Sequence, residues 1–448
     1  MYTINYDLSP QQQQVYDAMQ RGENVALFGD AGTGKSIIVK KFVQEHANSG
    51  NVICLAPTGL AARNIGEAQT IHSFFAIDPG SVGYCLEINQ HLDRMLPFVA
   101  TIIIDEISMV RSDLFDSIEQ ILRAVPYLGQ SRNPAFGGRQ IIVVGDFKQL
   151  PPVISDAEIA EFLDYQYNGE YAFMSNAWQM AAFRNYYLCE SFRQNSPEYC
   201  HLLRSIRNNT NTFAVLDTLN SRAVNEIPDT DCLASPNTLA LCGTRRLASQ
   251  INGAQLANLS GQPMLFPATI YGNFPVNEYP TEGQLLLKIG AKVMLLANKR
   301  RPDYICDSGF EYVNGDIGTV SCISQDHIGI QLASGRLVNV TRNTWFSYKY
   351  QLDIDGKAPR IKAKKVGVFT QFPIAIAYAC TIHKAQGQTL NSIYLKLGNG
   401  CFAPGQLYTA LSRIRNLDCL WLDNKIRVTD MIPNPVVDWF YDSIKYEL

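Results

Sequence analysis

Four short, mostly apolar runs alternate with segments of helical periodicity in the first half of the chain. Continuous apolar runs of this kind are typical of strands that are buried on both faces of a parallel sheet. Residues 111–124, which lie between two of the runs, carry an apolar stripe at helical spacing. The runs are residues 24–28, 52–56, 101–104 and 140–145. This alternation predicts a doubly wound α/β domain over residues 1–195.

The first helix has a complete start signal. Ser9 can cap the helix, Pro10 suits its first turn, and Gln12 stands at the capping-box position. We therefore predict a helix that begins at residue 10.

The α/β rhythm restarts after about residue 195 and is then interrupted. Residues 238–241 predict a strand and residues 245–256 a helix. The next segment, residues 286–367, contains short strand-like runs with Asn-Gly and Ser-Gly turn pairs between some of them, which predicts a small β-barrel. The runs are residues 291–296, 318–323, 328–332 and 337–340.

The α/β pattern resumes beyond this β-rich segment. It continues with a strand at residues 374–378, a helix near 404–415 and a strand at 419–422. We therefore expect a second α/β domain made of residues 196–285 and 368–448, with residues 286–367 inserted into it.

Composition narrows the class of protein. The 448 residues are 46% hydrophobic and 18% charged, as in ordinary globular proteins. A net charge of −3 and a pI of about 6.1 argue against a surface coated in positive charge, although they leave room for a local basic groove. The 11 cysteines form no C-x-x-C pair, and the six histidines are scattered, so a zinc or iron–sulfur site has little support.

The cysteine content and the apolar runs of the sequence indicate where in the cell the protein resides. Scattered, unpaired cysteines fit a reducing compartment. The N-terminal residues lack the apolar core of a signal peptide, and no run of 18 apolar residues occurs. We therefore expect a cytoplasmic protein without membrane spans, and its compact length favours a bacterial or phage source.

Residues 29–36, with the sequence GDAGTGKS, match the phosphate-binding pattern G-x-x-x-x-G-K-[ST]. The glycines let backbone N–H groups turn toward phosphate oxygens, and the following helix adds the positive end of its dipole. Lys35 would contact the β- and γ-phosphates, and the Ser36 hydroxyl would bind Mg²⁺. The predicted nucleotide ligands in this loop are Gly29, Gly32, Thr33, Gly34, Lys35 and Ser36.

Polar residues follow two further buried strands, where the ligand edge of a parallel sheet lies. Asp105 would hold Mg²⁺ through a water molecule, and Glu106 would orient or deprotonate the attacking water. Gln149 would bridge the phosphate and the water. The structural alternatives are a helix cap for the two acids and a solvated loop end for Gln149.

Hydrolysis of a phosphoanhydride calls for additional positive charge. Arg193, where the two domains join, and Arg413, on a helix of the second domain, are the candidates. If both reach the γ-phosphate, ATP would clamp the domains together and hydrolysis would release them. Ion pairs with local acids are the alternative for both arginines.

The ordered set of segments resembles the motifs of superfamily-one helicases of the RecD-like branch, and most closely the petite-integration-frequency (Pif) family. Residues 136–138 also resemble the end of a segment that marks this family. The matching segments are residues 8–12, 29–36, 56–62, 70–74, 104–109, 145–152, 312–318, 381–389 and 407–413. They extend over nearly the whole chain, whereas residues 123–134 do not match well.

The resemblance implies a fold of two RecA-like P-loop domains in tandem. A small wedge insertion would lie at about residues 74–98 of the first domain. An SH3-like β-barrel would form the insertion at residues 286–367 of the second.

The resemblance also implies binding residues. Gln12 would read adenine in addition to its capping role, and Gln386 and Gly387 would contact the nucleotide. The residues that would contact DNA are Pro57, Thr58, Thr70, His72, Phe74, Thr381, His383 and Lys384. Hydroxyl groups suit phosphate oxygens, and rings suit bases. The basic run from Lys357 to Lys365 would contact DNA or would protect a solvated strand edge.

The implied activity is an ATP- and Mg²⁺-dependent DNA helicase that moves 5′ to 3′ on single-stranded DNA and unwinds duplexes at junctions, in replication, repair and recombination. RNA–DNA hybrids and four-stranded guanine structures stay open as further substrates, and we expect a monomer. Two alternatives remain. One is an ATP-gated binding or remodelling module, or the motor subunit of a nuclease complex; the other is a P-loop NTPase unrelated to nucleic acid.

Overall fold

The computed structural model describes residues 7–46, 51–65, 68–77, 88, 90–154, 156–194, 196–223, 238–300, 310–312, 314–353 and 360–447. The chain forms two compact units. Unit 1 comprises Met1–Arg193, Tyr348–Lys365 and Asn434–Leu448, and unit 2 comprises Gln194–Ser347 and Val366–Pro433. Within the described residues, no helix is both long and apolar enough to cross a lipid bilayer.

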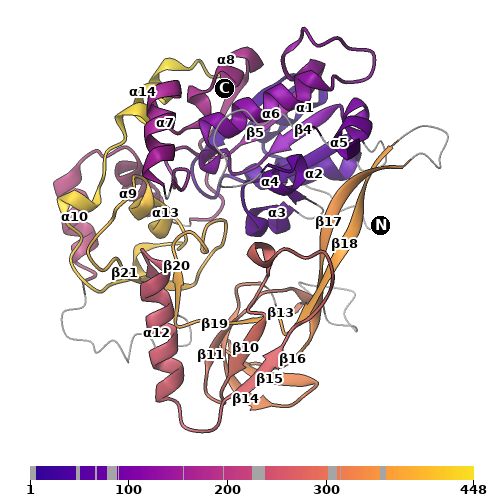
Figure 1. Ribbon diagram of the computed structural model, residues 1–448. Helices are drawn as coiled ribbons and strands as arrows, with labels where there is room; N and C mark the ends of the chain where they lie inside the picture. The colour runs from indigo at the N-terminus through magenta and orange to yellow at the C-terminus, as the bar shows by residue number, and fades with distance from the viewer. Residues whose placement is uncertain are drawn as a thin grey trace. The chain divides into compact units, whose positions relative to one another are not determined.

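Unit 1 is organised around a parallel sheet with the strand order β3-β2-β4-β5-β1-β6. Figure 1 labels its central strands β4 and β5. The predicted runs became strands to within a residue, because each is buried on both faces. The strands are β1 (Val25–Gly29), β2 (Val52–Ala56), β3 (Gln69–Thr70), β4 (Thr101–Ile104), β5 (Gln140–Val144) and β6 (Arg184–Leu188). The doubly wound fold predicted for this domain is confirmed.

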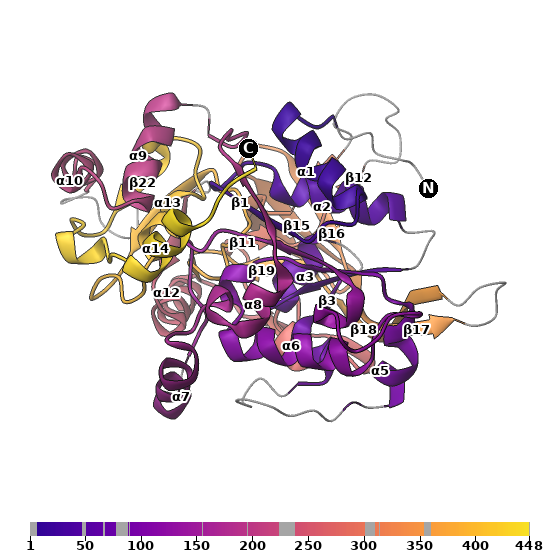
Figure 2. The same ribbon diagram turned by 90° about the horizontal axis from the view of Figure 1, so that it is seen from above.

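Alternate residues of each strand face two different apolar cores. Along β1, Val25 and Leu27 pack with helices α1 (Pro10–Gln20) and α2 (Lys35–His46). Ala26 and Phe28 face the opposite core, which contains α6 (Ser112–Ala124) and α8 (Asn176–Ala181). Figure 2 shows the two pairs of helices on opposite faces of the sheet. The other helices of this part of unit 1 are α3 (Gly59–Ile65), α4 (Ile71–Phe75), α5 (Gln90–Met95) and α7 (Ala157–Tyr167).

The predicted start of α1 is confirmed. The Ser9 hydroxyl accepts a hydrogen bond from the backbone nitrogen of Gln12, and the Gln12 side chain accepts one from the backbone nitrogen of Ser9. This reciprocal pair is the capping box that the sequence indicates.

The last helix corrects the expected domain boundary. Helix α14 (Pro435–Ser443) was expected in the second domain, but residues 434–448 belong to unit 1. Val437 and Phe440 are buried in the core behind Phe28, which explains the assignment. A domain boundary drawn from chain order alone misses such a return of the chain.

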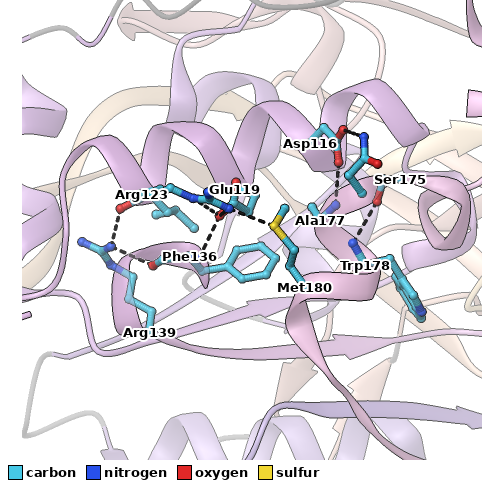
Figure 3. A network of polar contacts seen from close by, with 11 residues as sticks. Asp116, Glu119, Arg123, Phe136, Arg139, Ser175, Ala177, Trp178 and Met180 are labelled. Atoms are coloured by element: carbon cyan, nitrogen blue, oxygen red, sulfur yellow. Dashed lines mark hydrogen bonds and ion pairs between the residues drawn. The ribbon is translucent and has the colours of Figure 1, made fainter. Parts of the chain in front are cut away.

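Residues 136–139 pack at the C-terminal end of α6 around the buried Arg139 (Figure 3). The guanidinium of Arg139 donates hydrogen bonds to five backbone carbonyls. Gly137 has a φ of +61°, and a Cβ there would lie 2.4 Å from the carbonyl oxygen of Leu122. Glu119 accepts a hydrogen bond from the backbone nitrogen of Phe136 at 3.1 Å. The carbonyls belong to Leu96, Val99, Leu122, Val125 and Phe136.

The expected wedge at residues 74–98 falls partly outside the described residues, because residues 78–87 and 89 are among those left out. Its described parts are the end of α4, helix α5 and a 3₁₀ turn at Leu96–Phe98.

Unit 2 contains a second parallel sheet with the order β20-β7-β21-β22. Its strands are β7 (Thr238–Cys242), β20 (Ala379–Thr381), β21 (Ser392–Lys396) and β22 (Leu420–Leu422). Among the described residues, the helices of this unit are α9 (Pro197–Arg207), α10 (Thr212–Asn220), α12 (Arg245–Asn258) and α13 (Gln406–Leu411). The predicted second α/β domain is thereby confirmed as a parallel-sheet domain.

The β-rich insertion is larger than expected at both ends. Its main sheet is antiparallel, with the order β16-β15-β14-β11-β19. The predicted strand at 374–378 is β19 of this sheet rather than the first strand of the resumed α/β pattern, because it pairs with β11. Phe266 joins the same core, so the β-rich region begins well before residue 286. The main-sheet strands are β11 (Lys292–Leu295), β14 (Ile317–Ile323), β15 (His327–Leu332), β16 (Leu337–Thr341) and β19 (Ile374–Ile376).

The remaining strands of the insertion pair among themselves. β8 pairs with β10, β12 with β13, and β9 with β18 next to β17. Only the last part of β18 pairs with β9, which fits the grouping of residues 348–365 with unit 1 instead of with the insertion. The strands are β8 (Met264–Pro267), β9 (Thr269–Gly272), β10 (Gln284–Leu287), β12 (Lys299–Arg300), β13 (Phe310–Tyr312), β17 (Asn343–Asp353) and β18 (Arg360–Gln371).

Candidate nucleotide site and DNA interface

The glycine loop lies between β1 and α2, as predicted. Gly32 and Gly34 have φ values of +85° and +80°, which residues other than glycine rarely adopt. A Cβ at Gly34 would also lie 2.4 Å from Nε2 of Gln12. The ammonium of Lys35 donates hydrogen bonds to the carbonyls of Gly29 at 2.8 Å and Asp30 at 3.0 Å. Lys35 therefore stands within the loop at the start of α2, with Ser36 exposed beside it.

Gln12 connects the first helix to this loop. Its Oε1 atom completes the capping box, while Nε2 donates a hydrogen bond to the carbonyl of Thr33 at 3.1 Å. The structural role of Gln12 is thus complete, and it brings the amide against Thr33 and Gly34. Adenine recognition by the same amide stays a prediction.

Asp105 and Glu106 lie where β4 ends. Asp105 is buried, and burial together with the neighbouring Glu106 charge raises its pKa to about 7. The backbone of Glu106 has a φ of +52°, in the left-handed region that non-glycine residues seldom adopt. Such strain is common at functional sites.

The acids and Lys35 act on one another electrostatically. Burial lowers the pKa of Lys35, while the charges of four carboxylates favour its ammonium form. The carboxylates belong to Asp146, Glu106, Asp30 and Asp105, in order of effect. The structure therefore brings Lys35, Asp105 and Glu106 together, as the sequence predicts.

The donor chemistry near the loop suits magnesium. Hydroxyl and carboxylate oxygens such as those of Ser36 and Asp105 are the ligands that Mg²⁺ takes beside substrate phosphates. Among the described residues, no cluster of three or more His, Cys, Asp or Glu side chains forms an all-protein metal site. An ion held jointly by the chain and a phosphate fits this donor set, and its two protein ligands stay predictions.

Gln149 closes a tight turn after β5. Its backbone nitrogen donates to the carbonyl of Asp146 at 2.9 Å, and its side chain is mostly buried. The carboxylate of Asp146 accepts a hydrogen bond from the backbone nitrogen of Lys148 at 3.1 Å. The turn places Asp146, which sequence reasoning did not single out, next to Lys35 in the charge network. An aspartate directly after a buried strand was the available signal.

Arg193 and Arg413 belong to different units. The segment that carries Arg193 contacts the glycine loop, because the backbone nitrogen of Phe192 donates to the carbonyl of Gly32 at 2.9 Å. Arg413 is 1% exposed, and its guanidinium donates to the carbonyl of Thr409 and to the hydroxyl of Ser412. The structure supports Arg193 as a neighbour of the nucleotide loop, and the joint action of the two arginines stays a prediction.

Most predicted DNA-contact residues of unit 1 lie at helix starts. Thr58, after Pro57, accepts a hydrogen bond from the backbone nitrogen of Ala61 through its hydroxyl, and Thr70 caps α4 by accepting one from Ser73. His72 lies in α4, with Nδ1 3.3 Å from the carbonyl oxygen of Ile77. These contacts leave the DNA roles of the four residues as predictions.

Phe74 corrects one prediction. Its ring is 3% exposed and packs edge-to-face on Phe75 within the first core. A side chain with this burial cannot stack on a base without leaving the core, so a structural role explains it better. Phe74 lies on the apolar face of α4, which directs its ring into the core although its position in the motif suggested DNA contact.

In unit 2, the predicted contact residues surround the end of β20. The Thr381 hydroxyl accepts a hydrogen bond from the backbone nitrogen of Lys384, whose side chain is exposed. Burial and the nearby Arg245 lower the pKa of His383. Gln386 is buried, and Gly387 has a φ of +79°. Carboxyl ends of parallel strands are the usual ligand edge of such sheets.

Of the basic run, Lys357 lies outside the described residues, while Lys364 and Lys365 are exposed on β18. An exposed strand of this kind fits both predicted roles, DNA contact and protection of a strand edge.

Comparisons with known proteins fit this geometry. A family model described as PIF1-like helicase matches residues 7–215. The ATP-dependent DNA helicase Pif1 of Bdellovibrio bacteriovorus is 31% identical over 426 residues, which cover 93% of this chain and 88% of that protein. This chain belongs to the Pif1-like helicase family.

Solved Pif1 structures have the same fold. The crystal structure of Bacteroides sp. Pif1 in complex with ADP-AlF4 matches with a TM-score of 0.84 and 31% identity, covering 98% of this chain and 97% of that one. The Bacteroides Pif1 structure bound to ssDNA matches at 31% identity over the same shares of both chains, with a TM-score of 0.67. The family resemblance and the fold class of tandem RecA-like domains are confirmed.

Sequence reasoning did not single out two residues that the structure places around the phosphate-binding lysine and the Gln149 turn. Asp146 enters the Lys35 charge network, and Tyr441 of α14 contacts it through its hydroxyl at 3.2 Å. The position of Tyr441, nearly 300 residues further along the chain, gave no signal of this contact.

Proposed function

We propose that this chain is an ATP-dependent DNA helicase that moves 5′ to 3′ along single-stranded DNA and unwinds duplexes at junctions. The observation that carries the proposal is the charge network around Lys35, in which Asp105, Glu106 and Asp146 converge on the phosphate-binding loop. Arg413 belongs to unit 2, the second parallel-sheet unit. In the proposed cycle, ATP would clamp the two units together and hydrolysis would release them.

In the proposed hydrolysis step, the glycine loop and Lys35 bind the phosphates. Ser36 and Asp105 would hold Mg²⁺, which would neutralise negative charge on the phosphates when bound. Glu106 orients the attacking water and accepts its proton, and Gln149 fixes the water against the γ-phosphate. The resemblance to a Pif1 solved with ADP-AlF4 supports a nucleotide at this site.

Two positive groups would stabilise the charge that develops on the transferred phosphoryl group. Arg193 lies in the segment whose backbone is bonded to the glycine loop, and Arg413 of unit 2 would be the second group. Of the two arginines, only Arg413 belongs to the second unit. Its contribution would therefore make the rate of ATP hydrolysis sensitive to the conformation of the DNA-bound domains.

On the DNA side, the hydroxyls of Thr58, Thr70 and Thr381 would contact phosphates, and His72, His383 and Lys384 would add stacking and charge. A similar Bacteroides Pif1 is described as bound to ssDNA, which supports a single strand as the track. In this proposal the segment 74–98 separates the strands, and the antiparallel sheet of the insertion is an SH3-like barrel.

Several finer points belong to the same proposal. The enzyme would act as a monomer in bacterial or phage genome maintenance, and junctions would be its preferred substrates. RNA–DNA hybrids and four-stranded guanine structures are further candidate substrates to be compared with junctions in one assay.

Strand displacement tests the central proposal. We expect unwinding of a duplex with a 5′ single-stranded tail and none of a duplex with a 3′ tail, with ATP hydrolysis strongly stimulated by single strands. Unwinding only from the 3′ tail would contradict the polarity. ATP hydrolysis that single strands do not stimulate would instead favour an ATP-gated binding module.

A further inference from the structure

Helix α14 reaches the turn that carries Gln149 through polar contacts. The hydroxyl of Tyr441 donates a hydrogen bond to Oδ1 of Asp146 at 3.2 Å and accepts one from the backbone nitrogen of Phe147 at 3.0 Å. The ammonium of Lys148 forms an ion pair with Asp438. Asp438 and Tyr441 are three residues apart, so they share one face of the helix. This face therefore contacts each of the three residues that precede Gln149.

Aromatic packing holds the same helix in place. The ring of Phe440 stacks on Phe173 at 4.2 Å and meets Phe147 edge-to-face at 5.4 Å. It also meets Phe28 at 5.8 Å, one residue before the glycine loop begins. Interactions of this number in a close-packed core leave the helix little freedom to shift.

The contacted turn leads directly to the reacting groups. The backbone of Gln149 is bonded to the carbonyl of Asp146, so displacement of Asp146 would move Gln149 as well. Beside the burial of Lys35, the Asp146 carboxylate is the leading influence on its charge. One hydroxyl, that of Tyr441, thus restrains both the turn geometry and the carboxylate that faces the phosphate-binding lysine.

We propose that Tyr441 and Asp438 are positioning residues for ATP hydrolysis, which hold the Asp146–Gln149 turn in its working geometry. Neither residue is placed to contact the nucleotide; both act through the turn. The inference rests on the proposed function, in which Gln149 fixes the attacking water. Because α14 begins two residues after Pro433, the last residue of unit 2, it also ties this turn to the chain segment that leaves the second unit.

The variant Tyr441→Phe tests the proposal, because it keeps the ring and removes only the hydroxyl. We expect kcat for ATP hydrolysis at saturating single-stranded DNA to fall about tenfold, as for one hydrogen bond that matters in the transition state, with KM for ATP changed less than about twofold. Asp438→Asn, which removes the ion pair at a half-exposed position, should also lower kcat, but by a smaller factor.

Tyr171→Phe is the matched control. The Tyr171 hydroxyl accepts a hydrogen bond at 2.6 Å from Asn434, the N-cap of α14, and the Tyr171 ring, which the variant keeps, packs edge-to-face on Phe147. We expect this variant to lower the melting temperature as Tyr441→Phe does and to retain kcat. An unchanged kcat in both Tyr441→Phe and Asp438→Asn would overturn the proposal, and so would equal kcat losses in Tyr441→Phe and Tyr171→Phe.

The wild-type enzyme separates the two levels of inference. If it shows no ATP hydrolysis that single-stranded DNA stimulates, the proposed function fails, and the role of Tyr441 fails with it. If wild-type hydrolysis is stimulated and Tyr441→Phe hydrolyses ATP equally well, only the positioning role is wrong.

Discussion

Two residues show how the same chemistry, a charge removed from water, serves opposite purposes in this protein. The ammonium of Lys35 is bonded to two carbonyls of the glycine loop, and the charges of four carboxylates favour its charged form. The guanidinium of Arg139 donates its hydrogen bonds to backbone carbonyls, and burial lowers the pKa of Arg139 to about 10. The first arrangement attracts an anionic ligand; the second fixes local structure.

The residue-level chemistry makes Glu106 the sharpest test of the hydrolysis step. Glu106→Gln keeps the size of the side chain and removes its ability to accept a proton. We expect ATP binding to persist and kcat to fall by about 10²- to 10⁴-fold. Fluorescent-nucleotide binding and steady-state hydrolysis measure the two effects. Glu158→Gln, at an exposed position of α7, is the control, and a similar loss in that variant would discredit the assignment.

Arg139 predicts a stability effect instead. Arg139→Met removes the guanidinium donors of five backbone carbonyls that surround a buried position. We expect the free energy of unfolding to fall by at least about 3 kcal/mol, because buried acceptors lose their partners. Urea unfolding of this variant and of Arg132→Met, at an exposed position nearby, provides the comparison. A loss no larger than that of the control would show that other groups satisfy the carbonyls.

At the scale of helices and strands, the sequence pattern predicted those elements that are determined by local burial. The strands of the first sheet matched because each lies in one continuous apolar run, and the start of α1 matched because its capping residues are adjacent in sequence. β19 was assigned to the wrong sheet because an apolar run of three to five residues does not specify its partner strand. Phe74 was assigned to DNA because its motif position says nothing about which way its ring points. Partner choice and side-chain direction are tertiary properties.

A buried lysine joins two elements of unit 2 and predicts a pH effect. Lys292 of β11 donates a hydrogen bond to the carbonyl of Thr238 at the start of β7, and burial lowers its pKa to about 8. In the unfolded chain the lysine pKa is near 10.4. Between these values the unfolded state binds more protons, so the free energy of unfolding rises with pH through this residue.

Lys292→Met removes that titration. We expect the variant to be more stable than the wild type at pH 7, by up to about 3 kcal/mol, with an advantage that shrinks as pH rises from 8 toward 10. Urea unfolding at pH 7, 8, 9 and 9.5 measures the difference. Lys425→Met, at an exposed position, serves as the control. A difference that stays constant with pH would contradict the assignment of the titration to Lys292.

At the scale of the whole molecule, the charge balance limits how DNA is held. A protein with a net charge of −3 has no general attraction for phosphates, so its affinity must come from a few local contacts. Binding through a few local contacts favours a protein that can release the DNA strand at each step over one that holds the strand tightly. Motor function requires such release.

The charge argument predicts a shallow salt dependence of binding. Lys384→Ala should weaken binding to a labelled single strand and reduce the slope of log K against log salt by about 0.7, the value for one lost phosphate contact on a single strand. Fluorescence anisotropy across a salt series gives the slope. Lys425→Ala should leave it unchanged, and an unchanged slope in Lys384→Ala would remove this residue from the interface.

The return of α14 to unit 1 has a consequence for how the protein is made. About 240 residues separate the end of the first segment of unit 1 at Arg193 from Asn434, where its last segment begins. At about 5 to 20 residues per second, a ribosome needs roughly ten to fifty seconds to cover that distance. Throughout this interval the core that receives Val437 and Phe440 lacks both side chains. The ATPase core of the nascent chain is therefore completed only as synthesis reaches α14, which delays assembly of the Gln149 turn until the second unit has been made.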